Sequence, residues 1–146
     1  MSYEHTQRGK LLVVTAAIVV AVVSLVGALL PRTGDVLPSS VAGAVVIAVV
    51  ALFNRLTVAV GGGELRAAFG FGWPSRTMAI ADIVDVRIVR NRWYHGWGIR
   101  KIARGWMFNV WGLDAVELRM TSGRSFRIGT DQPAELEAAI AAERSR

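Results

Sequence analysis

The side chains best suited to chemistry lie in one basic and aromatic stretch, from residue 87 to residue 111. Six Lys and Arg residues and no Asp or Glu occur between Arg87 and Arg104, and four of the chain's 5 tryptophans lie between positions 93 and 111. Tryptophan favours the boundary between water and lipid, and each basic residue near an anionic lipid surface contributes about 1 kcal/mol. We therefore expect a lipid-binding surface. Its candidate residues are Arg90, Arg92, Trp93, Lys101 and Arg104.

The same stretch fits other interpretations. Trp97, Trp106 and Trp111 fall in expected strands, where they would bury a large area as core residues. Arg87 alternates with apolar residues, as on the solvated face of a strand. A protein partner is a third use of this surface. Bases combined with aromatic residues also bind nucleic acid, but we expect no nucleic acid partner because of the apolar runs described below.

Residue types that catalyse reactions are scarce. The chain has 2 histidines, His5 and His95, and no cysteine. Asp82 and Asp85 are three residues apart beside an expected strand, which places them on opposite faces. The glycines at 61–63 are not followed by the Lys-Ser/Thr of a phosphate-binding loop. We therefore expect a protein that is not an enzyme, with no cofactor and no metal site.

Two long apolar runs precede this stretch, at residues 11–30 and 36–53. The first run has no charged residue, and a helix of twenty residues is about 30 Å long, the thickness of the hydrocarbon core of a bilayer. The turn composition at 31–35 would make the two helices antiparallel. These features predict a transmembrane α-hairpin at 11–53, preceded by a tail at 1–10.

Basic residues near the ends of the two runs predict the orientation of the hairpin. Arg8 and Lys10 precede the first run and Arg55 follows the second, whereas the turn has only Arg32, which Asp35 balances. Both termini are therefore expected in the cytoplasm. This predicts a multi-pass protein of the inner, cytoplasmic membrane.

The remaining residues, 54–146, have the pattern of a mainly-β domain. Short apolar alternations are separated by Gly-rich breaks, which predicts about seven antiparallel strands in a sandwich or barrel. One strand is expected at residues 78–89, with Val84, Val86 and Ile88 facing inward. A helix is expected after Asp131, which would cap it, and its apolar face would cover one end of the sandwich.

Three segments of this domain resemble the bacterial membrane-anchored PH-like domain family. They are residues 78–86, 96–101 and 123–136, of which the last, a strand followed by Gly-Thr-Asp and a Pro-containing helix start, is the most specific. The resemblance covers roughly residues 54–144 and implies seven strands with one C-terminal helix. It implies binding beside a membrane and no reaction. The loop at 60–64 carries no base, so the headgroup site of phosphoinositide-binding PH domains is not transferred.

Together these patterns predict a non-catalytic integral membrane protein. Its PH-like domain would bind lipid or a membrane partner at the cytoplasmic face, with the bilayer, anionic headgroups or a membrane protein as partners. The alternative is an accessory subunit of a membrane complex that uses the hairpin and the domain as protein interfaces. The sequence leaves the ligand and the oligomeric state open.

Overall fold

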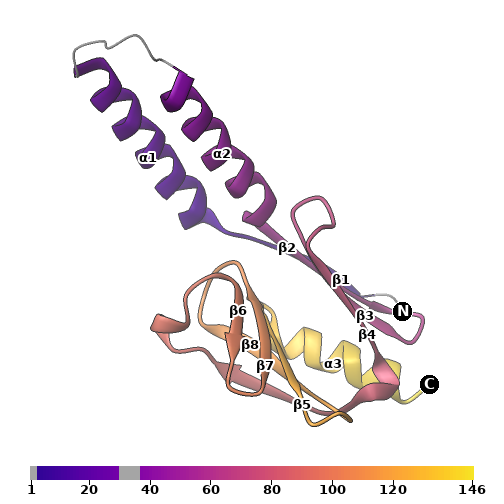
Figure 1. The fold of residues 1–146 in the computed structure, drawn as a ribbon. Coiled ribbons are helices and arrows are strands. Elements are labelled where there is room, and N and C mark those ends of the chain that lie inside the picture. Colours follow the sequence, from indigo (N-terminus) through magenta and orange to yellow (C-terminus); the bar gives the residue numbers. More distant parts are fainter. Residues whose placement is uncertain (1–2, 30–36) are drawn as a thin grey trace.

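The computed structural model describes residues 3–29 and 37–146. These residues form nine strands and three α-helices (Figure 1). In chain order the elements are β1 (Tyr3–Arg8), α1 (Lys10–Leu29), α2 (Leu37–Phe53), β2 (Arg55–Gly61), β3 (Glu64–Phe69), β4 (Ser75–Ala79), β5 (Ile83–Arg90), β6 (Gly98–Ile102), β7 (Gly105–Asn109), β8 (Asp114–Met120), β9 (Ser125–Gly129) and α3 (Pro133–Arg144), with short 3-10 turns at Ile80–Asp82 and Trp93–His95.

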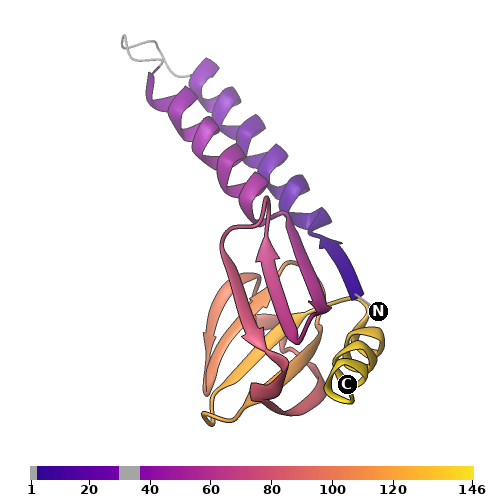
Figure 2. The same cartoon turned by 90° about the vertical axis from the view of Figure 1, so that its right-hand side faces the viewer.

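The two N-terminal helices lie side by side and extend away from the strands (Figures 1 and 2). We call α1 and α2 the helical pair, and β1 with residues 55–144 the β-part. Large apolar side chains of the helical pair are exposed on the described turns, as at Ile18 and Ile47. The helical pair is therefore not part of the buried core.

Among the described residues, no helix has the length and apolar character needed to cross a membrane. Leu30 and Val36, which the predicted spans included, lie outside the described residues, as does the predicted turn. On this finding the predicted transmembrane hairpin was wrong. The expected integral, multi-pass membrane protein, its place in the cytoplasmic membrane, and the cytoplasmic placement of its termini were wrong with it.

The first sheet contains four antiparallel strands in the order β1-β2-β3-β4. The strand β1 lies in the segment predicted as a tail, and it pairs with β2 from Tyr3 opposite Val60 to Arg8 opposite Arg55. Its residues are mostly polar, because one face of this outer strand is exposed. A mostly polar strand carries no apolar alternation, which is why the sequence pattern missed it.

The second sheet contains five strands in the order β5-β8-β9-β7-β6. Its pairs are antiparallel except for β7 and β9, which are parallel. Gly105 begins β7 at a place where a Cβ would overlap the backbone of Ser125. Glycine is therefore required for β7 to approach β9 this closely.

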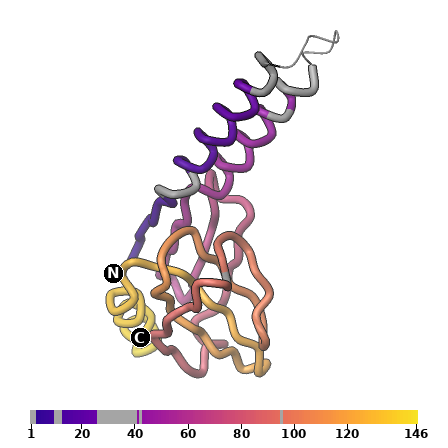
Figure 3. The backbone as a smooth tube through the Cα atoms, turned by 90° about the vertical axis from the view of Figure 1, so that its left-hand side faces the viewer, coloured from indigo at the N-terminus to yellow at the C-terminus, as the bar shows by residue number. Residues whose placement is uncertain are grey.

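The core lies between the two sheets, and α3 closes one end of it (Figure 3). The alternating pattern correctly predicted inward positions in β8 and β9, since Val116, Leu118 and Ile128 are fully buried. In α3, Leu136 and Ile140 face this core, as the helical spacing predicted. The residue before α3 is Gln132 and makes no side-chain cap. Asp131, expected as the cap, instead lies 2.6 Å from Nε2 of His5 in β1.

The predicted seven-stranded arrangement differs from the nine strands observed. One difference is the strand β1, which was not predicted. The other is the single strand predicted at 78–89, which the structure divides into β4 and β5 by a 3-10 turn at Ile80–Asp82. A bulge between Ile83 and Asp85 then changes which residues of β5 face inward. Ile83 is buried and Val86 packs against the core, whereas Val84 and Ile88 are exposed. The apolar run was read with one continuous period of two, and a bulge breaks that period.

Candidate anion-binding pocket

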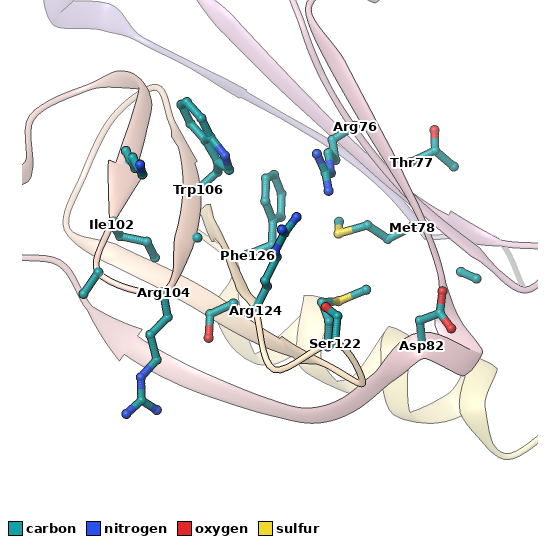
Figure 4. Close-up of a pocket in the computed structure, with 16 residues that line it drawn as sticks. Arg76, Thr77, Met78, Asp82, Ile102, Arg104, Trp106, Ser122, Arg124 and Phe126 are labelled. Atoms are coloured by element: carbon teal, nitrogen blue, oxygen red, sulfur yellow. The ribbon is translucent and has the colours of Figure 1, made fainter.

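A pocket of about 690 Å³ opens between β4 and the second sheet (Figure 4). One wall is the strand β4, from Arg76 to Ala79. The other wall comes from the turn that joins β6 to β7 and from the turn that joins β8 to β9. Its lining residues are Arg76, Thr77, Met78, Ala79, Asp82, Lys101, Ile102, Ala103, Arg104, Gly105, Trp106, Met120, Ser122, Arg124, Ser125 and Phe126.

Backbone hydrogen bonds hold the three segments around the pocket together. The N–H of Ser125 donates to the carbonyl of Arg104 at 2.9 Å, which fastens the β6–β7 turn to β9. The N–H of Thr121 donates to the carbonyl of Asp82 at 2.8 Å, which fastens the β8–β9 turn to the segment after β4. Gly123, at φ 76°, lets that second turn close tightly. The pocket is therefore built from a connected backbone rather than from a free loop.

The charge of the pocket is strongly positive. Four basic residues and one acidic residue line it. Within the described part of the chain, none of the four basic side chains forms an ion pair. Opposite charge nearby is therefore limited to Asp82, and the pocket favours an anion. The basic residues are Arg76, Lys101, Arg104 and Arg124.

Two arginines stand in the middle of the pocket. Arg124 extends beside Phe126 toward Arg76, whereas Arg104 extends outward from the rim (Figure 4). The guanidinium carbon of Arg76 lies 6.0 Å from the centroid of the Phe126 ring, the limit of a cation–π contact. Planar guanidinium groups can donate two hydrogen bonds at once to a carboxylate or a phosphate. Arg76 and Arg124 are thus the strongest candidates for direct contact with a ligand.

The structure brings together only two of the five residues predicted as a lipid-binding surface. Lys101 and Arg104 line the pocket, at the end of the β6–β7 hairpin that includes Gly105. Arg90 ends β5, and Arg92 and Trp93 follow it in the connection to the start of β6, which is the other end of this hairpin. The predicted set therefore does not form one site.

At that other end, Arg92 and Trp93 belong to a separate aromatic cluster. Nη1 of Arg92 donates to the hydroxyl of Tyr94 at 2.8 Å, and its guanidinium lies 5.8 Å from the Tyr94 ring centroid. Trp93 is 83% exposed and meets the Tyr94 ring edge-on at 6.0 Å. Arg92 is therefore already hydrogen-bonded to a neighbouring side chain.

The tryptophans of this region are not core residues. Trp97 and Trp111 stack on each other with their centroids 5.9 Å apart, and both remain partly exposed, as does Trp106 in the pocket. The side-chain amide of Asn109 donates to the carbonyls of Gly96 and Gly112, at 3.4 and 3.2 Å, and so fixes the two loops that carry the stacked pair. The interpretation of Trp97, Trp106 and Trp111 as core residues is therefore excluded.

Arg76, Arg124 and Phe126 were not among the predicted site residues. Arg76 lies in the strand that was merged with β5. Arg124 was predicted only as the first residue of a strand at 124–128, and in the structure it directly precedes β9. Arg124 and Phe126 are two positions apart, but Arg76 precedes them by 48 and 50 positions. Their spacing in sequence therefore gives no sign that Arg76 approaches the other two. Only the packing of the two sheets brings them together.

No group of three or more His, Asp or Glu residues in the described ranges could hold a metal ion. The His5–Asp131 pair at 2.6 Å joins β1 to the start of α3 and does not line the pocket. The pocket thus combines four basic side chains with the aromatic rings of Trp106 and Phe126.

Comparison with known proteins gives this chain no relative. No protein-family model matches it, and neither the curated proteins nor the solved structures include one with significant similarity.

Proposed function

We propose that this chain is a non-catalytic binding protein that holds an anionic ligand in the pocket between β4 and the second sheet. The observation that carries this proposal is the surplus of basic residues around one pocket, four against one, with no ion pair to neutralise them within the described residues. A single exposed cation contributes little binding free energy in water, whereas several cations that contact one anionic group contribute more. Phe126 and Trp106 supply an apolar wall for the rest of the ligand.

The proposal is tested with pyrophosphate, a small multivalent anion, and the full chain in a calorimetric titration. Binding should weaken as salt is added, because the attraction is electrostatic. Arg124→Gln and Arg76→Gln should each weaken binding by roughly 10-fold or more, since a hydrogen bond to a charged group contributes about 1.5–3 kcal/mol.

Arg90→Gln and Arg92→Gln provide matched controls, because they remove the same charge outside the pocket. They should leave the affinity nearly unchanged. Absence of pyrophosphate binding, or equal losses in the pocket and control variants, would contradict the proposed function.

The PH-like resemblance of residues 54–144 is a further proposal, limited to the β-part. It is supported by two packed sheets followed by one C-terminal helix. The extra strand β1 and the separate strand β4 differ from the seven strands that it implies. An experimental structure of the chain, superposed on PH domains, tests it.

A further inference from the structure

The strand β4 is one of the two outer strands of the first sheet. Its register with β3 shows which of its backbone groups are unpaired. Residues in an antiparallel pair alternate between hydrogen-bonded and non-hydrogen-bonded positions. The N–H of Phe69 donates to the carbonyl of Pro74, and the N–H of Ile80 donates to the carbonyl of Gly63. Ser75, Thr77 and Ala79 lie at the alternate positions, opposite Ala68, Arg66 and Glu64. Their N–H and C=O groups therefore point away from β3.

The free edge of β4 runs along the basic pocket. Residues 76–79 form one wall, and the side chains of Arg76 and Met78 extend into the pocket while Thr77 extends away from it (Figure 4). In the described residues, no strand pairs with β4 on this edge. A chain laid along the edge would thus place every second side chain into the pocket.

We propose that the ligand of the pocket is an extended acidic peptide of a partner protein, which adds to β4 as a fifth strand of the first sheet. This inference rests on the proposed function, since it names the carrier of the anion. The unpaired groups of Ser75, Thr77 and Ala79 supply main-chain hydrogen bonds, as in other cases of strand addition. The basic side chains select Asp or Glu at the positions that face the pocket.

The length of the edge sets the size of the peptide. The strand β4 has 5 residues, so it matches about five residues of an extended chain, about 16 Å at 3.3 Å per residue. Peptide residues that exchange hydrogen bonds with Thr77 share its face and so extend away from the pocket. The residues between them face Arg76 and Arg124. An alternating peptide, acidic toward the pocket and β-branched away from it, satisfies both requirements.

The test uses a fluorescent Glu-Val-Glu-Val-Glu-Val peptide and the full chain, read by fluorescence anisotropy. Two N-methylated analogues have the same charge and differ only in which N–H groups are lost. Methylation at the Val residues removes the donors that face β4 and should weaken binding at least 10-fold. Methylation at the Glu residues should have a much smaller effect. Equal effects of the two analogues would overturn strand addition.

A substitution in β4 tests strand addition by removing a donor from the protein instead of the peptide. Thr77→Pro removes an N–H that the pairing with β3 does not use, and should weaken binding of the peptide about 10-fold more than binding of pyrophosphate. Thr77→Val keeps the N–H and should bind the peptide as tightly as the wild-type chain does. In the wild-type chain, the amides of Ser75, Thr77 and Ala79 should become protected from hydrogen exchange when peptide is added, whatever the fate of the proline variant.

The outcomes separate this inference from the proposed function. If pyrophosphate binds and the peptide does not, only the inference of strand addition is overturned. Arg76 would then be an edge charge that prevents strand pairing. If vesicles of anionic lipid compete with pyrophosphate and the peptide does not bind, strand addition is also overturned. The ligand would then be a lipid headgroup. If neither pyrophosphate nor the peptide binds, the proposed function is overturned as well.

Discussion

Val, Leu and Ile make up much of both the helical pair and the β-part, but the two regions place these side chains in different surroundings. In the β-part, Val60, Leu118 and Ile128 are buried between the sheets. In the helical pair, Val14, Ile18 and Ile47 are about half exposed or more. Apolar composition alone therefore does not predict burial. The period of the pattern and the presence of a second packed layer decide it.

A row of phenylalanines connects the two regions and ends at the pocket. Phe53, the last residue of α2, lies 5.3 Å from Phe69, measured between ring centroids. Phe69 lies 5.0 Å from Phe108, which lies 5.0 Å from Phe126. The base of the helical pair is thus packed against the core, although its remaining described turns are not. The following predictions test how far the two regions differ in energy.

The largest effect is expected for Phe69→Ala. Phe69 is fully buried in the middle of the aromatic row, and truncation of such a ring costs about 3–5 kcal/mol through lost burial and the cavity left behind. All 5 tryptophans lie after residue 54. Denaturant unfolding followed by tryptophan fluorescence therefore reports the β-part of the full chain.

Ile18→Ala is the matched control in the helical pair, where the side chain is 57% exposed. It should change the same transition by less than about 0.5 kcal/mol. A similar loss in both variants would show that the helical pair contributes as much to this transition as the core, and the comparison would be wrong.

The next largest effect is expected where the two regions meet, for Gly70→Ala. Gly70 has φ 51°, and a Cβ there would lie 2.6 Å from the carbonyl oxygen of Leu52 in α2. The substitution combines about 1–2 kcal/mol of backbone strain with a clash against a rigid helix. We expect a loss of roughly 2–3 kcal/mol.

Gly62→Ala separates the two contributions. Gly62 has φ 63° but open space around its Cβ position, so only the backbone strain applies. The excess loss in Gly70→Ala over Gly62→Ala measures the contact between α2 and Gly70, which follows β3. Equal losses would mean that this contact does not resist the added methyl group.

The sequence predicted the elements whose burial follows one regular period. The alternation of β8 and β9 and the helical spacing of α3 led directly to the core positions Leu118, Ile128 and Ile140. It failed where a strand is polar, as in β1, or where a bulge interrupts the period, as in β5. These features depend on neighbouring strands, which a local pattern does not contain.

The candidate site was less predictable than the fold. Lys101 and Arg104 were recognised from a local excess of bases, which is a property of one segment. Arg76 and Arg124 reach the same pocket from strands and turns far apart in the chain. Their approach depends on how the two sheets pack. Nothing in the spacing of these residues indicates that packing.

A smaller effect is expected for a polar contact inside the β-part, at Arg127. Its Nε donates to Oε2 of Glu117 at 3.1 Å, and its Nη1 donates to Oδ1 of Asn91 at 3.0 Å. Both side chains of the ion pair are largely buried, at 17% and 27% exposed. Arg127→Ala leaves Glu117 without its partner and should cost about 1–3 kcal/mol.

Arg87→Ala removes a similar contact at the surface, where Nε donates to Asp85 at 2.7 Å but the arginine is mostly solvated. Exposed pairs contribute about 0–1 kcal/mol, so this loss should be near zero in 0.15 M salt. If Arg87→Ala costs as much as Arg127→Ala, burial does not explain the value of the pair.

The smallest effect concerns Tyr3, where β1 approaches α3. Burial, with added repulsion from Glu135 and Asp131, raises the pKa of the Tyr3 hydroxyl above its usual 10.0. The folded chain therefore holds this proton at a pH where the unfolded chain has lost it. The resulting stabilisation is complete below pH 10 and is lost as the pH rises from 10 through the raised pKa.

Tyr3→Phe removes this dependence. The hydroxyl has no hydrogen-bond partner in the described residues, so the substitution should change stability at pH 7 by less than about 0.5 kcal/mol. Unfolding measured from pH 8 to pH 11 should show a shallower decline for Tyr3→Phe than for the wild-type chain. Parallel declines would place the Tyr3 hydroxyl in water. Since the contact of β1 with the core would then be looser than the structure has it, β1 would resemble the exposed helical pair more than the strands it joins.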